Sequence, residues 1–416
     1  MPGTEGRLVS ETVAGGQKLW SRSFVGITLS TLISSLGDGA ALVGLPLLAA
    51  SLNRSPLVVA LVVVAQRVPW LFSIVTGTIT DRVRLRRYVA EIEGTRMAVV
   101  ASLGLCVAVH FHPLIAIFVV ATLLGTTESA FFAATGRMVL EAVAIADLGT
   151  ANGYLYASQM SSSVAGQAVG GLLAPVSLAL PFLVDGASFG LSALLLVGLA
   201  IGPTRGEPTS TEGSLRDGMR QGWGWFARHP ALIVTSSYVA VLALCQTMVM
   251  SVLVIWALRT IHLTRPGYGL LEAVATSGTL LGALMAGRLV TRFGNGPMLL
   301  ATAALAAATY WVAGAVDSAV LAGAALFVEQ AAVAAGAVAN QAMRQQMIPK
   351  EMIGRVANIT RSMIYGAVPL GALSGGLIST RFGPRVPFFV AGGLQLALVA
   401  LVGPRMVRLL AADQPA

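Results

Sequence analysis

A few charged side chains lie inside long apolar runs, where an unpaired charge is costly. Asp38 stands in the apolar run 24–51. It shares one helical face with three hydroxyl residues, Thr31, Ser34 and Ser35. A carboxyl group in such a place pairs with a cation or binds a proton. We therefore expect this polar face to point away from lipid, and Asp38 is the first candidate for a proton-binding residue.

Two arginines within apolar runs are candidate partners for these acids. Arg67 lies in the run 57–80, and a rise of 1.5 Å per residue puts Arg67 and Asp38 at the same depth, about 20 Å from one membrane face. The predicted Asp38–Arg67 pair is either purely structural or broken when Asp38 takes up a proton. Arg96 lies at the depth of Glu128, but it also follows Glu93 by three residues, so a local Glu93–Arg96 pair is the simpler alternative.

Other acids and polar residues could contact a bound molecule. Glu128 precedes Phe131 and Phe132 by three and four positions, and an acid beside aromatic rings suits an amphipathic or cationic organic molecule. Glu329 shares a helical face with Asn340 and is the third candidate for proton binding, after Asp38 and Glu128. Further candidates for this contact surface are Gln246 and Tyr365.

Several kinds of chemistry are not predicted. Asp185 and Glu272 lie near the ends of apolar runs, where a carboxylate is usually solvated or caps a helix. His110 and His112 lack a third ligand, so no metal site is expected. No nucleophile cluster or phosphate-binding loop appears, which argues against catalysis, a cofactor and ATP hydrolysis.

The composition requires helices that cross a bilayer to position these residues. Of 416 residues, 56% are hydrophobic and 11% are charged, against about 25% charged in ordinary soluble domains. The net charge of +9 is spread over short loops, which argues against a nucleic-acid partner. Because a span needs about 20 apolar residues, we predict an all-α membrane protein with twelve spans. They are 24–51, 57–80, 87–109, 113–137, 148–177, 180–202, 231–259, 266–290, 296–316, 318–343, 352–380 and 384–408.

The distribution of Lys and Arg predicts the orientation. Most of them fall in segments on the same side as the N-terminus, so both termini are expected in the cytoplasm. A polar stretch rich in Gly, Pro and Ser divides the chain in two. The predicted parts are a tail 1–23, a six-helix bundle 24–202, a linker 203–222, a second bundle 223–408 and a tail 409–416.

The turn between the second and third predicted spans is unusually rich in charge. It contains Gly77, Asp81, Arg82, Arg86 and Arg87, and resembles the signature loop of major facilitator superfamily transporters. The resemblance implies that this loop is a conformational gate. A partial copy of the pattern occurs 210 residues later, as expected for two parallel repeats. The copy has Thr291 at the position of Asp81, so only the first keeps its acid.

Further motifs resemble the drug–proton antiporter branch of that superfamily, which includes macrolide-efflux-type and siderophore exporters. They are Leu36-Gly37-Asp38, Ala151-Asn152-Gly153, Phe182-Leu183-Val184-Asp185, Tyr268-Gly269-Leu270-Leu271-Glu272 and Gly354-Arg355-Val356. One departure is Gln167, where that branch usually has proline.

The resemblance implies an antibiotic- or multidrug-type exporter, monomeric in the bacterial cell membrane, that uses a proton gradient and alternating access to move small hydrophobic molecules. A dedicated siderophore exporter, an importer, a membrane-embedded enzyme and a non-transporting receptor are the alternatives.

Overall fold

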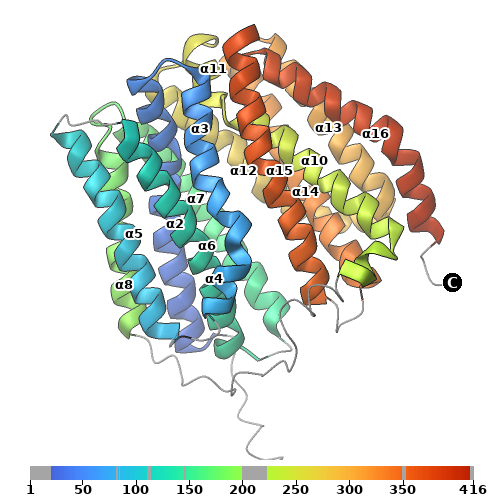
Figure 1. The fold of residues 1–416 in the computed structure, drawn as a ribbon, viewed down its shortest axis with the longest axis horizontal. Coiled ribbons are helices and arrows are strands. Elements are labelled where there is room, and N and C mark those ends of the chain that lie inside the picture. The colour runs from blue at the N-terminus through green and yellow to red at the C-terminus, as the bar shows by residue number, and fades with distance from the viewer. Residues whose placement is uncertain are drawn as a thin grey trace, which may run out of the picture.

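The computed structural model describes residues 20–80, 83, 85–109, 114–144, 147–198, 223–348 and 353–412, and long helices dominate these ranges (Figure 1). The first group of helices is α2 (Arg22–Leu52), α3 (Pro56–Arg67), the 3-10 helix η1 (Val68–Phe72), α4 (Ser73–Thr80), α5 (Leu85–Ala108), α6 (Leu114–Ala142), α7 (Leu148–Leu173) and α8 (Leu180–Gly198). The second group is α10 (Pro230–Met250), α11 (Leu253–Arg259), α12 (Arg265–Phe293), α13 (Asn295–Ala315), α14 (Ala319–Met347), α15 (Ile353–Phe382) and α16 (Val386–Ala412).

The helices follow the predicted apolar runs, except that two predicted spans, 57–80 and 231–259, are divided; the second consists of α10 and α11. Within the described ranges, nine are long and apolar enough to cross a bilayer. The predicted continuous span 57–80 is instead divided into α3, η1 and α4. Pro69 lies in η1 and has no backbone N–H to donate, which accounts for the break in the α-helical hydrogen bonds. The predicted linker 203–222 and most of the predicted tails lie outside the described residues.

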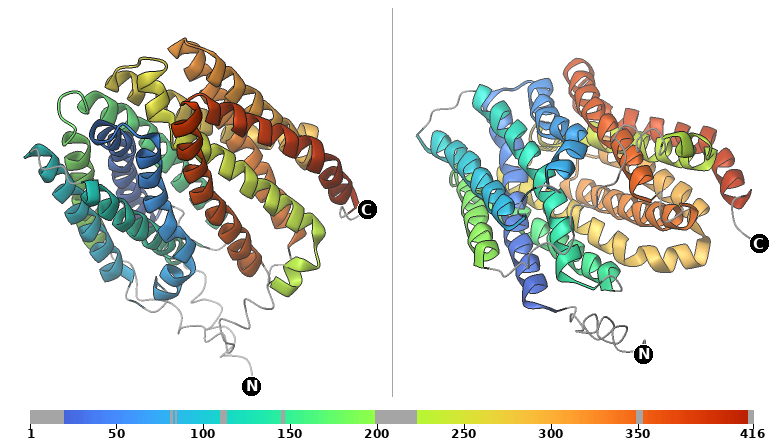
Figure 2. Two further views of the ribbon diagram at one scale, coloured as in Figure 1. Left: turned by 45° about the horizontal axis from the view of Figure 1, so that its top comes forward. Right: turned by 60° about the horizontal axis from the view of Figure 1, so that its bottom comes forward.

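The helices pack as two groups that follow one another along the chain (Figures 1 and 2). In the first group α2 packs against α7 and α8, and α5 packs against α8. In the second group α12 packs against α14, and α10 packs against α15 and α16. The most extensive contacts between the groups join α7 to α12 and α3 to α15, and α2 also contacts α11 and α12.

The described chain begins at the lower end of the bundle in Figure 1, which we call the inner end; the opposite end is the outer end. The closest contacts between the groups lie at the outer end. A Cβ atom added to Gly171, near the end of α7, would lie 2.6 Å from the Cα atom of Gly269, near the start of α12. A Cβ atom added to Gly376 would lie 2.5 Å from that of Ala60. Toward the inner end the two groups diverge (Figure 1).

Candidate functional site

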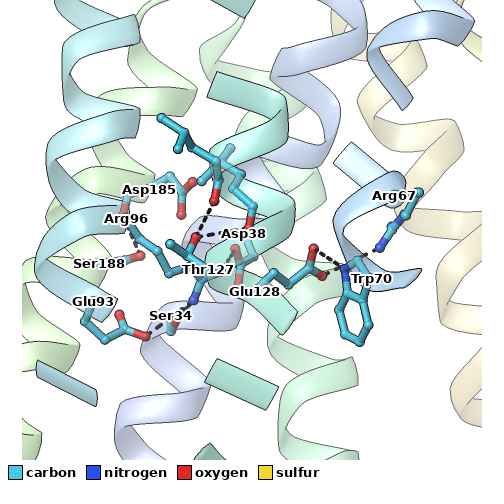
Figure 3. Close-up of polar contacts among 12 residues, drawn as sticks. Ser34, Asp38, Arg67, Trp70, Glu93, Arg96, Thr127, Glu128, Asp185 and Ser188 are labelled. Atoms are coloured by element: carbon cyan, nitrogen blue, oxygen red, sulfur yellow. Dashed lines mark hydrogen bonds and ion pairs between the residues drawn. The ribbon is translucent and has the colours of Figure 1, made fainter. Parts of the chain in front are cut away.

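Arg96, on α5, is the centre of a buried ionic cluster that also contains Asp38, Glu93 and Asp185. Its guanidinium donates to Asp38 Oδ1 over 2.7 Å and lies 3.4 Å from Glu93 Oε1 (Figure 3). It also donates to Ser34 Oγ over 3.3 Å. The predicted polar face of α2 therefore points at α5, where it binds a cation, and the local Glu93–Arg96 pair is present as well.

Asp185 approaches this cluster from α8. The approach requires Gly37, because a Cβ atom at that position would lie 2.6 Å from Asp185 Oδ1. The expectation that Asp185 is solvated or capping is wrong, since the residue is 1% exposed. Among the residues that the structure describes, its Oδ1 atom has no hydrogen-bond partner, and neither has Glu93 Oε2. One guanidinium thus lies among three carboxyl groups.

Arg67 does not pair with Asp38 as predicted. It lies 3.7 Å from Glu128 Oε1, and the indole N–H of Trp70 donates to the other oxygen of Glu128 over 3.4 Å (Figure 3). The prediction relied on depth along the helix, which Asp38 and Arg67 share. Depth does not determine the direction in which the Arg67 side chain points around its helix. This side chain turns toward α6 at the point where α3 passes into η1.

Aromatic rings extend this second group of charges across the boundary between the two helix groups. The ring centroid of Trp70 lies 4.8 Å from that of Tyr365, on α15, and 5.7 Å from that of Phe132, on α6. The Arg361 guanidinium lies 5.3 Å from the Phe132 centroid. We call Arg67, Trp70, Glu128, Phe132, Arg361 and Tyr365 the interface cluster.

The other predicted contact residues lie in different surroundings. Phe131 is buried beneath Arg96, 5.4 Å from its guanidinium, whereas Ser35 is partly exposed. In the second helix group, Gln246 donates to Gln330 over 2.9 Å. Asn340 is buried there, and its side-chain oxygen has no hydrogen-bond partner within the described part of the chain.

Glu329, the third predicted proton-binding acid, also lies in the second helix group. Its carboxyl accepts a 2.6 Å hydrogen bond from the Tyr310 hydroxyl and is 0% exposed. No cation pairs with it among the residues that the structure describes. Glu329 is thus separate from both clusters.

The predicted gate is described only in part. Asp81 and Arg82 lie outside the described residues, and Gly77 and Arg86 are placed only as backbone in α4 and α5. Arg87 is exposed and pairs with Glu91 over 2.8 Å. Beside the loop, Arg137 of α6 donates to the Thr80 carbonyl oxygen at the end of α4.

Sequence reasoning misses Trp70 and Arg361 of the interface cluster and Asp185 of the ionic cluster. It assigns no role to Trp70 or Arg361, and it places Asp185 among solvated or capping residues. For Trp70 a signal was available, because the Pro69-Trp70 pair interrupts an apolar run. No such signal marks Asp185, whose partner helix depends on the packing of α2 against α8.

Comparisons with known proteins agree with this architecture. Residues 18–414 match the family described as transmembrane secretion effector. No curated protein matches the sequence at a significant level.

Solved transporters share the fold at low identity. A bacterial homologue of the human lysosomal transporter Spinster, inward-facing and unoccupied, is 15% identical, with a TM-score of 0.74 over 97% of this chain and 100% of that one. A bacterial homologue of the iron transporter ferroportin, inward-facing, is 15% identical, with a TM-score of 0.72 over 94% and 99%. The nucleoside transporter NupG is 10% identical, with a TM-score of 0.71 over 94% and 99%. From the family match and the fold together, we conclude that this chain is a multi-pass membrane transporter that belongs to the transmembrane secretion effector family of the major facilitator type.

Proposed function

We propose that this transporter exports hydrophobic or amphipathic small molecules from the cell by proton antiport, as a monomer in a bacterial cell membrane. The observation that carries the proposal is the ionic cluster, in which a single guanidinium faces three carboxyl groups. An apolar interior tolerates unbalanced charge poorly, so the cluster is expected to hold protons in place of the missing cations.

Asp38 is the member of the cluster that we assign to proton exchange. Its side chain is 44% exposed, whereas Glu93 and Asp185 are 0% and 1% exposed. Exchange with bulk water requires access, and only Asp38 has it. In the proposed cycle, deprotonated Asp38 binds Arg96, and protonated Asp38 releases Arg96 to Glu93 and the nearby Asp185.

The arrangement of helices supports alternating access. The backbone contacts at Gly171 and Gly269 hold the outer end together, and the groups diverge toward the inner end. We propose that this is the state that loads substrate from the cytoplasm. Proton release from Asp38 at the inner end and uptake at the outer end would then drive export.

A first experiment identifies a transported compound, and a second measures whether a proton gradient drives its transport. Susceptibility of cells with and without the protein, measured over a broad compound panel, selects a transported compound. Wild-type protein in proteoliposomes should accumulate that compound against its gradient when a pH gradient is imposed. Asp38→Asn should abolish accumulation but keep exchange of labelled for unlabelled compound, because asparagine imitates the protonated acid permanently.

A matched control uses a carboxyl on α5 outside the cluster. Glu91→Gln removes an exposed acid that pairs only with Arg87, and it should accumulate substrate like wild type. Accumulation by Asp38→Asn at the wild-type level would remove Asp38 as the coupling residue and leave Glu128 as the next candidate. If the compound accumulates only when the pH gradient is reversed, the protein is an importer.

A further inference from the structure

We propose that the interface cluster binds the negatively charged group of an amphipathic substrate that also carries an aromatic ring. The inference rests on the proposed function and names the class of molecule transported. Glu128 and the neighbouring phenylalanines alone predict an amphipathic or cationic molecule. The inference keeps the amphipathic class and replaces the positive charge by a negative one.

Glu128 is not available to a cationic ligand because it is already engaged. One of its oxygens lies 3.7 Å from Arg67 and the other accepts from Trp70. A cation entering here would meet an acid whose charge is balanced by its neighbour. The attraction that the sequence suggested is therefore largely cancelled.

The α15 side of the cluster carries positive charge that no acid balances. Arg361 is exposed, and its guanidinium lies over the Phe132 ring rather than beside a carboxylate of the described residues. Arg344, on α14, is only 8% exposed, and its Nε atom has no hydrogen-bond partner among the described residues. Neither pairs with an acid in the described ranges.

A guanidinium that no carboxylate balances is a group that an anion would stabilise. A carboxylate can accept from a guanidinium through two parallel hydrogen bonds, which a cation or neutral ester cannot. We thus assign the anionic part of the substrate to Arg361, whose side chain is exposed and lies against the Phe132 ring.

The ring of the substrate has an aromatic surface beside this charge. Phe132 is 51% exposed, the Trp70 ring lies next to it, and the Tyr365 ring lies next to Trp70. Tyr365 also lies within electrostatic range of Arg361, Arg67 and Glu128, so rings and charges form one site. Offset stacking against such rings favours a flat aromatic ligand.

The experiment compares three probes that share one ring system and differ in charge. Purified full-length protein in lipid nanodiscs is titrated with naphthylacetate, naphthylacetamide and naphthylethylamine, and binding is measured by calorimetry. The anion should bind more tightly than the cation, on the order of tenfold or more for a charge-assisted contact. Empty nanodiscs provide the correction for partition into lipid.

Substitution of single arginines identifies the residue that causes the preference for the anionic probe. Arg361→Gln should reduce the affinity for naphthylacetate to that of the amide, and Arg361→Glu should make the cation the tightest ligand. Arg405→Gln, which removes an exposed arginine of α16, should leave all three affinities unchanged.

Equal affinities for the three probes, or tighter binding of the amine by wild type, would overturn the inference. Anion preference that persists in Arg361→Gln would do so too, because it would place the anion elsewhere. These outcomes leave the proposed function standing if proton-driven export is intact in proteoliposomes, so the two proposals fail separately.

Discussion

At the scale of single residues, Arg96 determines whether the ionic cluster is stable. It is the cation shared by Asp38 and Glu93, and its guanidinium also lies 4.0 Å from the ring centroid of Phe189. Removing it leaves buried carboxyl groups without a partner. Removing Asp38 instead leaves Arg96 with Glu93 and with the nearby Asp185.

We therefore expect opposite outcomes from the two substitutions. Arg96→Leu should cost about 3–5 kcal/mol, the usual cost of breaking a buried pair from one side, and should sharply reduce the yield of folded protein. Asp38→Asn keeps an oxygen that accepts from Arg96 and should cost about 1 kcal/mol. Thermal unfolding in detergent, followed by size-exclusion chromatography, measures both. Comparable losses for the two variants would show that Asp38 is itself structural.

The residues of this cluster also show what sequence alone can predict. The polar face of α2, which includes Asp38, follows from spacing, and the Glu93–Arg96 pair follows from helical geometry. The longer-range partners do not. Asp38 and Arg67 have the same depth, but depth leaves open the direction of each side chain around its helix, which is set by the packing of α2 against α7 and α8 and of α3 against α6 and α15.

At the scale of elements, the contact between α7 and α12 closes the outer end. It depends on two glycines, because Gly171 and Gly269 bring the two backbones together without side chains between them. The run 57–80 illustrates the limit of sequence reasoning at this scale. Its composition predicts one span, yet Pro69 lies in η1 and Trp70, just after it, lies beside Tyr365 of α15.

A bulky residue at the glycine contact should open the outer end. Gly269→Leu is expected to lower transport and to increase the distance between spin labels at Ser55→Cys and His262→Cys, which lie at the outer ends of the two groups. The labels are placed in protein whose native Cys106 and Cys245 are replaced, and double electron–electron resonance gives the distances. Gly287→Leu is the control, because no atom lies within 4 Å of a Cβ at that position of α12. Unchanged distances in Gly269→Leu would mean that this contact does not hold the outer end closed.

At the scale of the whole molecule, two six-helix groups are expected from the repeated motif, the linker composition and the resemblance, and the helices do pack as two successive groups. The amino-acid composition does not determine at which end the two helix groups are in contact. Whether the groups meet at one end or the other depends on a few contacts between α3, α7, α12 and α15, which are far apart in the sequence. The orientation in the membrane determines what that state means for transport.

The orientation itself can be tested directly. Because Lys and Arg are concentrated in segments on the side of the N-terminus, the inner end should face the cytoplasm. A reporter that fluoresces only in the cytoplasm should be bright when fused after Gln221 and dark when inserted within His110–His112. An enzyme reporter that is active only outside should give the opposite pattern, and each reporter thus controls for poor expression of the other. The same orientation makes the observed contacts those of a carrier closed to the outside, ready to take its substrate from the cytoplasm. A reversed pattern at both positions would put the closed end in the cytoplasm, and the proposed loading step for export would then be wrong.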